Sequence, residues 1–354
     1  MNNFISNWLR PNIKAINAYH VPASENMVKL DAMESPFPLS DKLIEQYSAC
    51  LANAQLNRYP NPNAIELQQT LRALMDIPAD CGVLLGNGSD ELIQLLALAC
   101  DTDDTILSLD PSFVMYEMIA KFTCLNYQGV DLNDDFEIDL SAMLLAIETH
   151  QPKLIFIAYP NNPTGNTFDR TAIEKIITST HALVVLDEAY YAYANDSFLN
   201  DIKKYSNLVL LRTVSKIGFA GLRLGLLIGA KDTVEQLDKL RLPYNINTLT
   251  QVSANFLLQE KDEINKNAQI ILSERTKLSA TLNAINTLEV YPSQANFILF
   301  KAPNANELFT TLKQKGILIK NLSNAPKLTN CLRVTVGSSE QNKKFIDIVE
   351  VFYG

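Results

Sequence analysis

Lys216 is the residue of this sequence whose surroundings best suit chemistry on a carbonyl group. It lies in the stretch LLRTVSKIGFAGLRLG (residues 210–225), on a turn between two apolar runs that we expect to be strands. Small apolar neighbours would remove water from its ammonium group, which lowers the pKa and frees the amine to attack an aldehyde. Ser215 and Arg223 add a hydroxyl and a guanidinium, two donors that suit a phosphate ester. Together they predict a site for an aldehyde that carries a phosphate, whereas a Ser-Lys pair alone indicates only an exposed lysine.

A second candidate anion site is the turn GNGSDE (residues 86–91). We expect a short strand before it, at residues 83–85, and a helix that opens at Ser89. Backbone N–H groups at such a turn can point at an anion, and the helix dipole adds its own attraction. Asp90 and Glu91 would repel a bound phosphate, so we expect their carboxylates to point away from it. Many strand-to-helix turns contain glycine, so this turn is weak support by itself.

Polar and aromatic residues also stand at the ends of predicted strands, where open α/β sheets bind their ligands. Phe113 follows the strand at residues 105–109 and could stack on a flat ligand, with a position in the core as an equal alternative. Asp187 ends the apolar strand at residues 183–186, where a carboxylate would be costly without a cationic partner. Tyr190 lies three residues further on and could reach the same crevice.

The order of strands, turns and helices predicts an α/β fold: a large domain with a mainly parallel sheet flanked by helices, plus a smaller α+β domain. About ten residues separate the strand that ends near Thr213 from the one that begins near Leu224, too few for a helical crossover. We therefore expect these two strands to be antiparallel or not adjacent. The expected division is an N-terminal arm at 1–40, which joins the small domain and the dimer contacts, a large domain at 41–245 and a small domain at 246–354.

The arm and the segment that follows it are rich in proline, which rules out one long helix. The arm contains Pro11, Pro22, Pro36 and Pro38. In NRYPNP (Asn57–Pro62), two prolines flank Tyr59 and fix an extended segment that can project the phenol outward. An ordinary linker is the alternative for this segment.

Composition limits the classes of partner. The 354 residues are 47% apolar and 19% charged, which suits a large core in two lobes. The net charge of −9 and the absence of a basic run argue against nucleic acid or an anionic membrane as partner. No apolar run approaches the roughly 18 residues of a membrane span, and the N-terminus lacks the pattern of a signal peptide. We therefore expect a cytoplasmic protein with small-molecule partners.

No metal site is expected. The five cysteines lack C-x-x-C spacing, and the three histidines, His20, His150 and His181, stand far apart in the sequence. The reaction is therefore expected to depend on an organic cofactor or on side chains alone.

Eight short motifs follow one another along nearly the whole chain: RYPNP, GNGSDELI, PSFVMY, NNPTG, LDEAYYAY, SKIGFAGLRLG, NFIL and CLRVTVG. In order and spacing they resemble the fold-type-I pyridoxal-5′-phosphate aminotransferases and, within them, the histidinol-phosphate aminotransferases. The resemblance implies a homodimeric enzyme of histidine biosynthesis with pyridoxal 5′-phosphate as its cofactor. It would convert L-histidinol phosphate and 2-oxoglutarate to imidazole-acetol phosphate and L-glutamate.

The resemblance also implies roles for single residues. Lys216, Asp187 and Tyr190 would be catalytic: Lys216 would form a Schiff base with the cofactor, and Asp187 would pair with the pyridinium nitrogen. Tyr190 and Asn162 would hydrogen-bond the 3′-oxygen of the ring, and Phe113 would stack on the ring. The cofactor phosphate would be held by the backbone at Gly88, Ser89 and Asp90, the side chains of Ser215 and Arg223, and Tyr59 of the second subunit.

On the expected substrate side the chain departs from the family pattern. Arg333 would bind the substrate anion, with Asn296 nearby. The family often has Asn-x-Asn-Glu-Asn-Pro where this chain has residues 31–36, DAMESP, which include Glu34. Many members have an arginine where this chain has Lys320, and a lysine supplies charge without a bidentate fork. These departures concern the choice of substrate rather than of cofactor.

Other functions remain open. An aromatic or broad-range aminotransferase, or a decarboxylase or lyase on the same scaffold, would share the cofactor site, and the decarboxylase would consume no amino acceptor. A non-catalytic ligand-sensing domain is disfavoured by the acidic charge and the lack of a helix-turn-helix segment. A nicotinamide dehydrogenase is disfavoured because GNGSDE lacks the third glycine of G-x-G-x-x-G.

Overall fold

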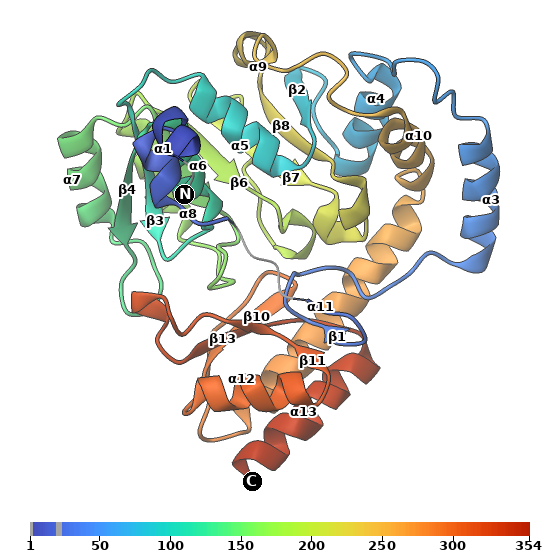
Figure 1. The fold of residues 1–354 in the computed structure, drawn as a ribbon, viewed down its shortest axis with the longest axis vertical. Coiled ribbons are helices and arrows are strands. Elements are labelled where there is room, and N and C mark those ends of the chain that lie inside the picture. The colour runs from blue at the N-terminus through green and yellow to red at the C-terminus, as the bar shows by residue number, and fades with distance from the viewer. Residues whose placement is uncertain (1–2, 19–22) are drawn as a thin grey trace.

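The computed structural model describes residues 3–18 and 23–354, so His20 and Pro22 lie outside the described residues. A large part, at the top of Figure 1, is built on a mainly parallel sheet, and a smaller part, at the bottom, on an antiparallel sheet. The α/β fold class predicted from the sequence is confirmed.

Within the described residues, seven strands form the large sheet, in the order β2-β8-β7-β6-β5-β3-β4. They are β2 (Cys81–Gly86), β3 (Thr105–Asp110), β4 (Asn126–Asp131), β5 (Leu154–Ala158), β6 (Leu183–Asp187), β7 (Leu208–Thr213) and β8 (Gly225–Ala230). Strands β3 to β7 run parallel, whereas β8 is antiparallel to both β2 and β7. The pair that flanks Lys216 is therefore antiparallel, as expected from its short connection.

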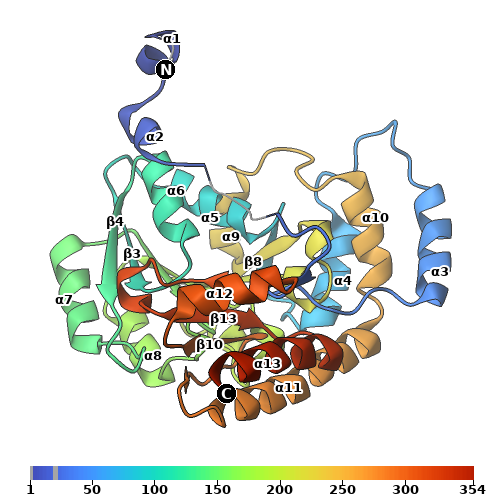
Figure 2. The same cartoon turned by 60° about the horizontal axis from the view of Figure 1, so that its bottom comes forward.

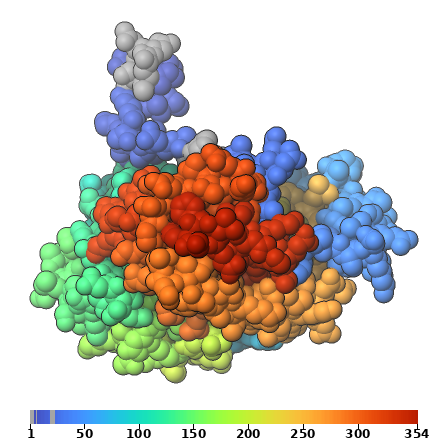
Figure 3. Space-filling view, turned by 90° about the horizontal axis from the view of Figure 1, so that it is seen from below, coloured from blue at the N-terminus to red at the C-terminus, as the bar shows by residue number. Residues whose placement is uncertain are grey.

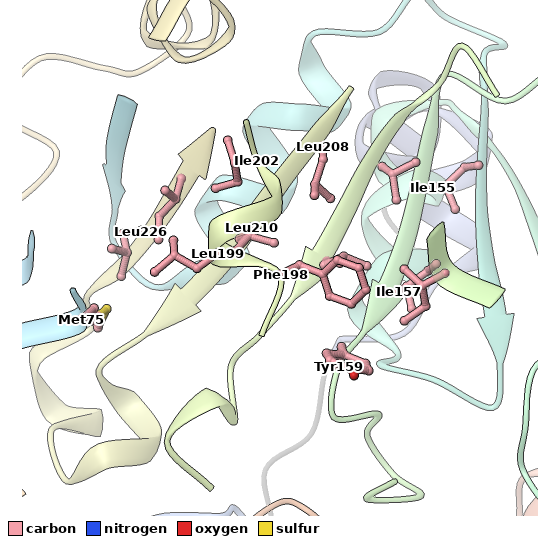
Figure 4. Close-up of a cluster of buried hydrophobic side chains, with 14 of the residues drawn as sticks. Met75, Ile155, Ile157, Tyr159, Phe198, Leu199, Ile202, Leu208, Leu210 and Leu226 are labelled. Atoms are coloured by element: carbon pink, nitrogen blue, oxygen red, sulfur yellow. The ribbon is translucent and has the colours of Figure 1, made fainter. Parts of the chain in front are cut away.

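Helices cover both faces of the large sheet, which explains its continuous apolar strands. They are α4 (Ile65–Met75), α5 (Ser89–Leu98), α6 (Met115–Thr123), α7 (Leu140–His150), α8 (Arg170–Thr178) and α9 (Lys231–Asp238). Apolar residues of α5, α6 and α9 pack with Val209 of β7, and those of α4, α7 and α8 pack with its neighbours Leu208 and Leu210. Figure 4 shows this second cluster, in which Phe198 lies between Leu210 and Ile157.

The small part is built on a four-stranded antiparallel sheet in the order β12-β13-β10-β9. Its elements are β9 (Glu289–Val290), β10 (Phe297–Lys301), β12 (Lys320–Asn321), β13 (Cys331–Thr335), α11 (Lys261–Asn283), α12 (Ala305–Gln314) and α13 (Ser339–Tyr353). The arm joins this part, because its strand β1 (Val28–Lys29) pairs in parallel with β11 (Ile317–Leu318).

The chain after residue 245 does not pass directly into the small part. Helix α10 (Thr248–Leu257) packs against α3 (Asp41–Ala52) and α4, and its Ala254 lies in the hydrophobic cluster of the large sheet. Along α11, Ile264 packs in the hydrophobic cluster of the large sheet, whereas Ile271 packs in the hydrophobic cluster of the small part. We therefore place the boundary within α11, the long helix that runs between the two parts in Figure 1, rather than at residue 246.

The first two helices, α1 (Asn3–Trp8) and α2 (Pro11–Ala15), project from the body of the molecule, as Figures 2 and 3 show. Arg10 fastens them to the end of α6 by donating a hydrogen bond of 2.6 Å to the carbonyl of Phe122. Single 3-10 turns are η1 (Tyr191–Tyr193), η2 (Leu199–Asp201), η3 (Ser215–Ile217), η4 (Ala220–Leu222) and η5 (Pro326–Leu328). None of the helices in the described part of the chain is both long and apolar enough to cross a membrane.

Candidate active site

A cavity of about 260 Å³ lies at the carboxyl ends of β5, β6 and β7 and gathers residues that are far apart in the sequence. The predicted site residues that line it are Glu34, Ser89, Asp90, Phe113, Asn162, Asp187, Tyr190, Ser215, Lys216 and Arg223. Three of the residues predicted on the substrate side lie in the small part and are not among the residues that line this cavity: Asn296, Lys320 and Arg333.

Lys216 lies on the turn η3, directly after β7. The hydroxyl of Tyr193 donates a 2.6 Å hydrogen bond to the Lys216 carbonyl, which fixes the turn. Its Nζ donates to the carbonyl oxygen of Ala32 at 3.1 Å. Burial, and after it the charge of Arg333, lowers the pKa of the Lys216 amine to about 8. A useful fraction of this lysine is therefore a free amine near neutral pH, as nucleophilic attack requires.

Asp187 ends β6 at the floor of the cavity and is 5% exposed. Its carboxylate accepts hydrogen bonds from the hydroxyl of Tyr116 at 2.9 Å and from the amide of Ala189 at 3.1 Å. Both of these donors are neutral, and burial raises the pKa of the Asp187 carboxyl to about 6. A ligand that brings a positively charged N–H group would therefore stabilise the ionised form.

The turn before α5 forms a cradle for an anion. Gly88 has a φ of 88°, a conformation that residues with a side chain rarely adopt, so the turn favours glycine; a Cβ atom there would also lie 2.7 Å from Nη2 of Arg223. The hydroxyl of Thr213 lies 2.9 Å from the hydroxyl of Ser215 and 3.1 Å from the carbonyl of Leu224, and the hydrogen bond between the two hydroxyls positions Ser215 at the cradle. With the amides at the start of α5, these groups supply neutral and charged donors to one place.

The expectation that Asp90 points away from this cradle is wrong. Asp90 lines the cavity, and its Oδ2 lies 3.7 Å from Nη2 of Arg223. The guanidinium attracts the carboxylate, although burial raises the pKa of Asp90. The carboxylate of Glu91 is held elsewhere: it accepts hydrogen bonds from the backbone amide of Asn87 at 2.6 Å and from the side chain of Asn245 at 2.9 Å.

Two aromatic residues border the cavity, and each packs against the ring of another aromatic residue. Phe113 meets Tyr116 edge to face with 5.5 Å between ring centroids, and Tyr190 meets Phe297 in the same way at 5.1 Å. Asn162 accepts a hydrogen bond from Nη1 of Arg333. These contacts orient the groups that were predicted to surround a flat ring.

The predicted substrate side lies on the small sheet. Arg333 is 7% exposed and donates a 3.0 Å hydrogen bond to the carbonyl of Asp31. Lys320 pairs with Arg333 in the register of β12 and β13, and burial, then the charge of Arg333, lowers the pKa of Lys320. Glu34 accepts from Lys29 at 2.8 Å. Asn296 is 1% exposed and donates to the carbonyl of Met33 at 3.0 Å.

Tyr59 lies away from the cavity of its own chain. It is 81% exposed, and its ring stacks on Tyr244 with 4.5 Å between centroids. This placement agrees with a projecting phenol, while any role at a second subunit stays a prediction.

Three contributors to the site had no assigned role in the sequence interpretation. Tyr116 could have been found, because it follows Phe113 by three residues on the first turn of α6 and so faces the same crevice. Thr213 could have been found from its spacing of two residues from Ser215. The carbonyl of Ala32 could not, because no side chain marks a backbone acceptor.

The residues present fit pyridoxal 5′-phosphate, the cofactor implied by the resemblance. Asp187 is a buried carboxyl that a pyridinium would stabilise, Lys216 is an amine that an aldehyde would engage, and the cradle at Gly88 suits a phosphate. Among residues 3–18 and 23–354, no group of histidine, cysteine and acidic side chains is arranged to hold a metal ion.

Comparisons with known proteins show the family of the chain. Residues 25–349 match the family model described as aminotransferase class I and II. The histidinol-phosphate aminotransferase of Vesicomyosocius okutanii is 71% identical over 99% of both chains, and that of Chromobacterium violaceum is 46% identical over 98% of both. The crystal structure of histidinol-phosphate aminotransferase from Sinorhizobium meliloti in complex with pyridoxal-5′-phosphate has the same fold, with a TM-score of 0.85, 21% identity and 98% of both chains covered. The chain therefore belongs to the class I and II aminotransferases and, within them, to the histidinol-phosphate aminotransferase family.

Proposed function

We propose that this chain transfers the amino group of L-histidinol phosphate to 2-oxoglutarate, giving imidazole-acetol phosphate and L-glutamate, as a step of histidine biosynthesis. The observation that carries the proposal is the pairing, in one cavity, of an amine with a lowered pKa and a carboxyl with a raised pKa beside an anion cradle. Opposite shifts of this kind are typical of catalytic groups. The identity of 71% to a histidinol-phosphate aminotransferase supports the choice of substrate.

The residues of the cavity divide the chemistry among them. Bound pyridoxal 5′-phosphate supplies an aldehyde for the amino group and a ring that withdraws electrons from the substrate Cα. Asp187 would hold the proton on the ring nitrogen, and its burial prevents water from replacing it. The Nζ of Lys216, once free, would accept the proton that leaves the substrate Cα. Gly88, Ser215 and Arg223 would anchor the phosphate throughout the reaction.

The substrate side must accept two anions of different size in turn, a phosphate ester and a carboxylate. Arg333 presents a fixed guanidinium fork that suits both groups. Lys320, its neighbour on β12, carries a compact charge on a flexible stem that can follow the bulkier dianion. We infer that Arg333 serves both half-reactions and that Lys320 favours histidinol phosphate.

The substrate assignment is tested by comparing amino donors. With 2-oxoglutarate as acceptor, kcat/KM should be highest for histidinol phosphate, and aromatic amino acids should be slower donors. If phenylalanine or tyrosine gave the higher kcat/KM, an aromatic or broad-range aminotransferase would replace this assignment. Release of carbon dioxide from an amino acid, without consumption of 2-oxoglutarate, would indicate a decarboxylase.

We further propose that the enzyme is a homodimer in which Tyr59 reaches the cofactor phosphate of the partner subunit. Large apolar side chains are exposed on two neighbouring segments, as expected for an interface: Leu56, Tyr59, Ile65, Leu242, Tyr244 and Leu249. The two segments are joined by the Tyr59–Tyr244 stack and by a 3.0 Å hydrogen bond from Arg241 to the carbonyl of Pro62. The cytoplasmic location expected from the sequence stays a prediction.

Subunit complementation tests this dimer. An inactive Lys216→Ala chain mixed with a Tyr59→Phe chain would form heterodimers in which one cavity lacks both groups and the other has both. Activity should therefore rise above that of either parent once subunits exchange. A monomer by sedimentation, or no rise after exchange has been verified with differently tagged chains, counts against the proposal.

A further inference from the structure

Three successive carbonyl groups of the arm, at residues 31–33, each accept a hydrogen bond from a different side chain beside the cavity. One donor lies on β13 of the small sheet, one directly precedes β10 of that sheet, and one lies on the turn after β7, so the tripeptide bridges both parts of the molecule. The bonds run from Arg333 to Asp31 at 3.0 Å, from Lys216 to Ala32 at 3.1 Å and from Asn296 to Met33 at 3.0 Å.

The backbone of Met33 makes this arrangement possible and has to be held in place. Its φ of 55° lies in the left-handed region, which a residue with a side chain occupies only when its surroundings enforce it. The amide of Met33 donates to the hydroxyl of Thr335 at 3.0 Å, and its carbonyl accepts from Asn296. Both partners belong to the small sheet or adjoin it, so the small sheet fixes the strained residue from both sides.

We propose that Asn296 is a positioning residue: it holds the carbonyl of Met33 and thereby fixes the neighbouring carbonyl of Ala32, which receives the amine of Lys216 whenever that amine is free. The inference rests on the proposed function, in which Lys216 is released in each half-reaction. It replaces the substrate-binding role that the sequence predicted for Asn296. This side chain is 1% exposed and is not among the residues that line the cavity. Its Nδ2 donates to Met33, while its Oδ1 is buried without a hydrogen-bond partner among the described residues.

The amine of Lys216 needs such positioning because the lysine side chain is flexible. A free amine on a four-carbon stem can adopt many rotamers, and only a few of them place Nζ where a proton leaves the substrate. A fixed carbonyl acceptor restricts the amine to that region without removing its lone pair. Because the contact is made by the backbone, the departure of residues 31–33 from the family pattern leaves it intact.

The first test needs no cofactor. In the apoprotein, Asn296→Ala should speed hydrogen exchange of the Met33 amide about tenfold, the effect of one lost hydrogen bond. Thr335→Val, which removes the acceptor of that amide, should act in the same direction and serves if Asn296→Ala does not fold. The matched control is Asn342→Ala: Asn342 is also buried in the small part, where it donates to Gly337 and Glu274 at 3.1 Å each, and its loss should leave Met33 unchanged.

The second test follows the glutamate half-reaction in single turnovers with substrate deuterated at Cα. Asn296→Ala should slow this step about tenfold and enlarge the isotope effect, while half-saturation by glutamate stays within about twofold. A raised half-saturation with an unchanged isotope effect would show contact with substrate and overturn the inference. Equal effects of Asn342→Ala, or unchanged exchange at Met33, would overturn it as well. A wild-type protein without aminotransferase activity would refute the proposed function, and the exchange comparison would still decide the role of Asn296.

Discussion

Replacing Asp187 by asparagine removes a titratable proton from the cavity and keeps the shape of the side chain. The asparagine oxygen can accept from the amide of Ala189, and its NH₂ group can donate to the oxygen of Tyr116, so both hydrogen bonds of the carboxylate have a substitute. The variant therefore isolates the effect of the charge. We expect an apoprotein that is more stable at neutral pH and a holoenzyme that binds its cofactor less tightly.

The magnitude follows from the pKa of Asp187, which burial raises from 3.8 to about 6. A shift of about 2 units corresponds to roughly 3 kcal/mol at 1.36 kcal/mol per unit. The folded protein keeps this proton to a higher pH than the unfolded chain, so stability is lost as pH rises from about 4 to about 6 and stays lost above that range. Asparagine has no such proton, so the advantage of Asp187→Asn should grow from near zero at about pH 4 to roughly 3 kcal/mol near pH 7.

Urea unfolding of the two apoproteins over this pH range measures the difference directly. Added pyridoxal 5′-phosphate should then stabilise the wild type more than the variant, because the loss of one charge-assisted hydrogen bond weakens binding by about one to two orders of magnitude. The reasoning is refuted if Asp187→Asn is the less stable apoprotein at neutral pH, or if the difference between the two proteins does not change with pH.

Further expectations concern the amine and the substrate anion. In the apoprotein, Lys216 should react with a small acylating reagent at a rate that rises with pH through a midpoint near 8, because its lowered pKa makes it a free amine above that value; a midpoint above 10 would contradict the burial argument. Lys216→Ala should abolish turnover in a protein whose circular dichroism and melting temperature stay close to those of the wild type. Arg333→Ala should lower kcat/KM for both half-reactions by one to two orders of magnitude, whereas Lys320→Ala should impair histidinol phosphate more than glutamate; equal effects of Lys320→Ala would be inconsistent with its proposed role.

Much of the cavity could be predicted because its residues follow strands. A strand with continuous apolar character, such as residues 183–187, has a recognisable end, and parallel strands bring their carboxyl ends to one edge of the sheet. Asp187 ends such a strand and Phe113 follows another parallel strand, and both line the cavity. The short connection around Lys216 likewise excluded a parallel neighbouring pair and left an antiparallel or a non-adjacent pair; the structure shows β7 and β8 as antiparallel neighbours.

The parts that were not predicted depend on tertiary contacts. Strand β4, with the sequence NYQGVD, is half-polar because it lies at the edge of the sheet, and its composition carries no strong strand pattern. Asp90 faces the cavity because Arg223, 133 positions later, attracts it. The role of the carbonyls of residues 31–33 could not be predicted, because every residue has a backbone carbonyl and no side chain marks these three. The role of Asn296 could be inferred only from the partner of its side-chain amide.

The central claim is that Lys216 bonds the cofactor in this cavity, and borohydride trapping tests it most directly. The holoenzyme is reduced, digested and mapped by mass spectrometry, with Lys216→Ala treated in parallel as the control. We predict the mass of reduced pyridoxal phosphate on the peptide that contains Lys216, and no modified peptide from the variant. Modification of a different lysine in the wild type, or equal modification of the Lys216→Ala protein, would contradict the account.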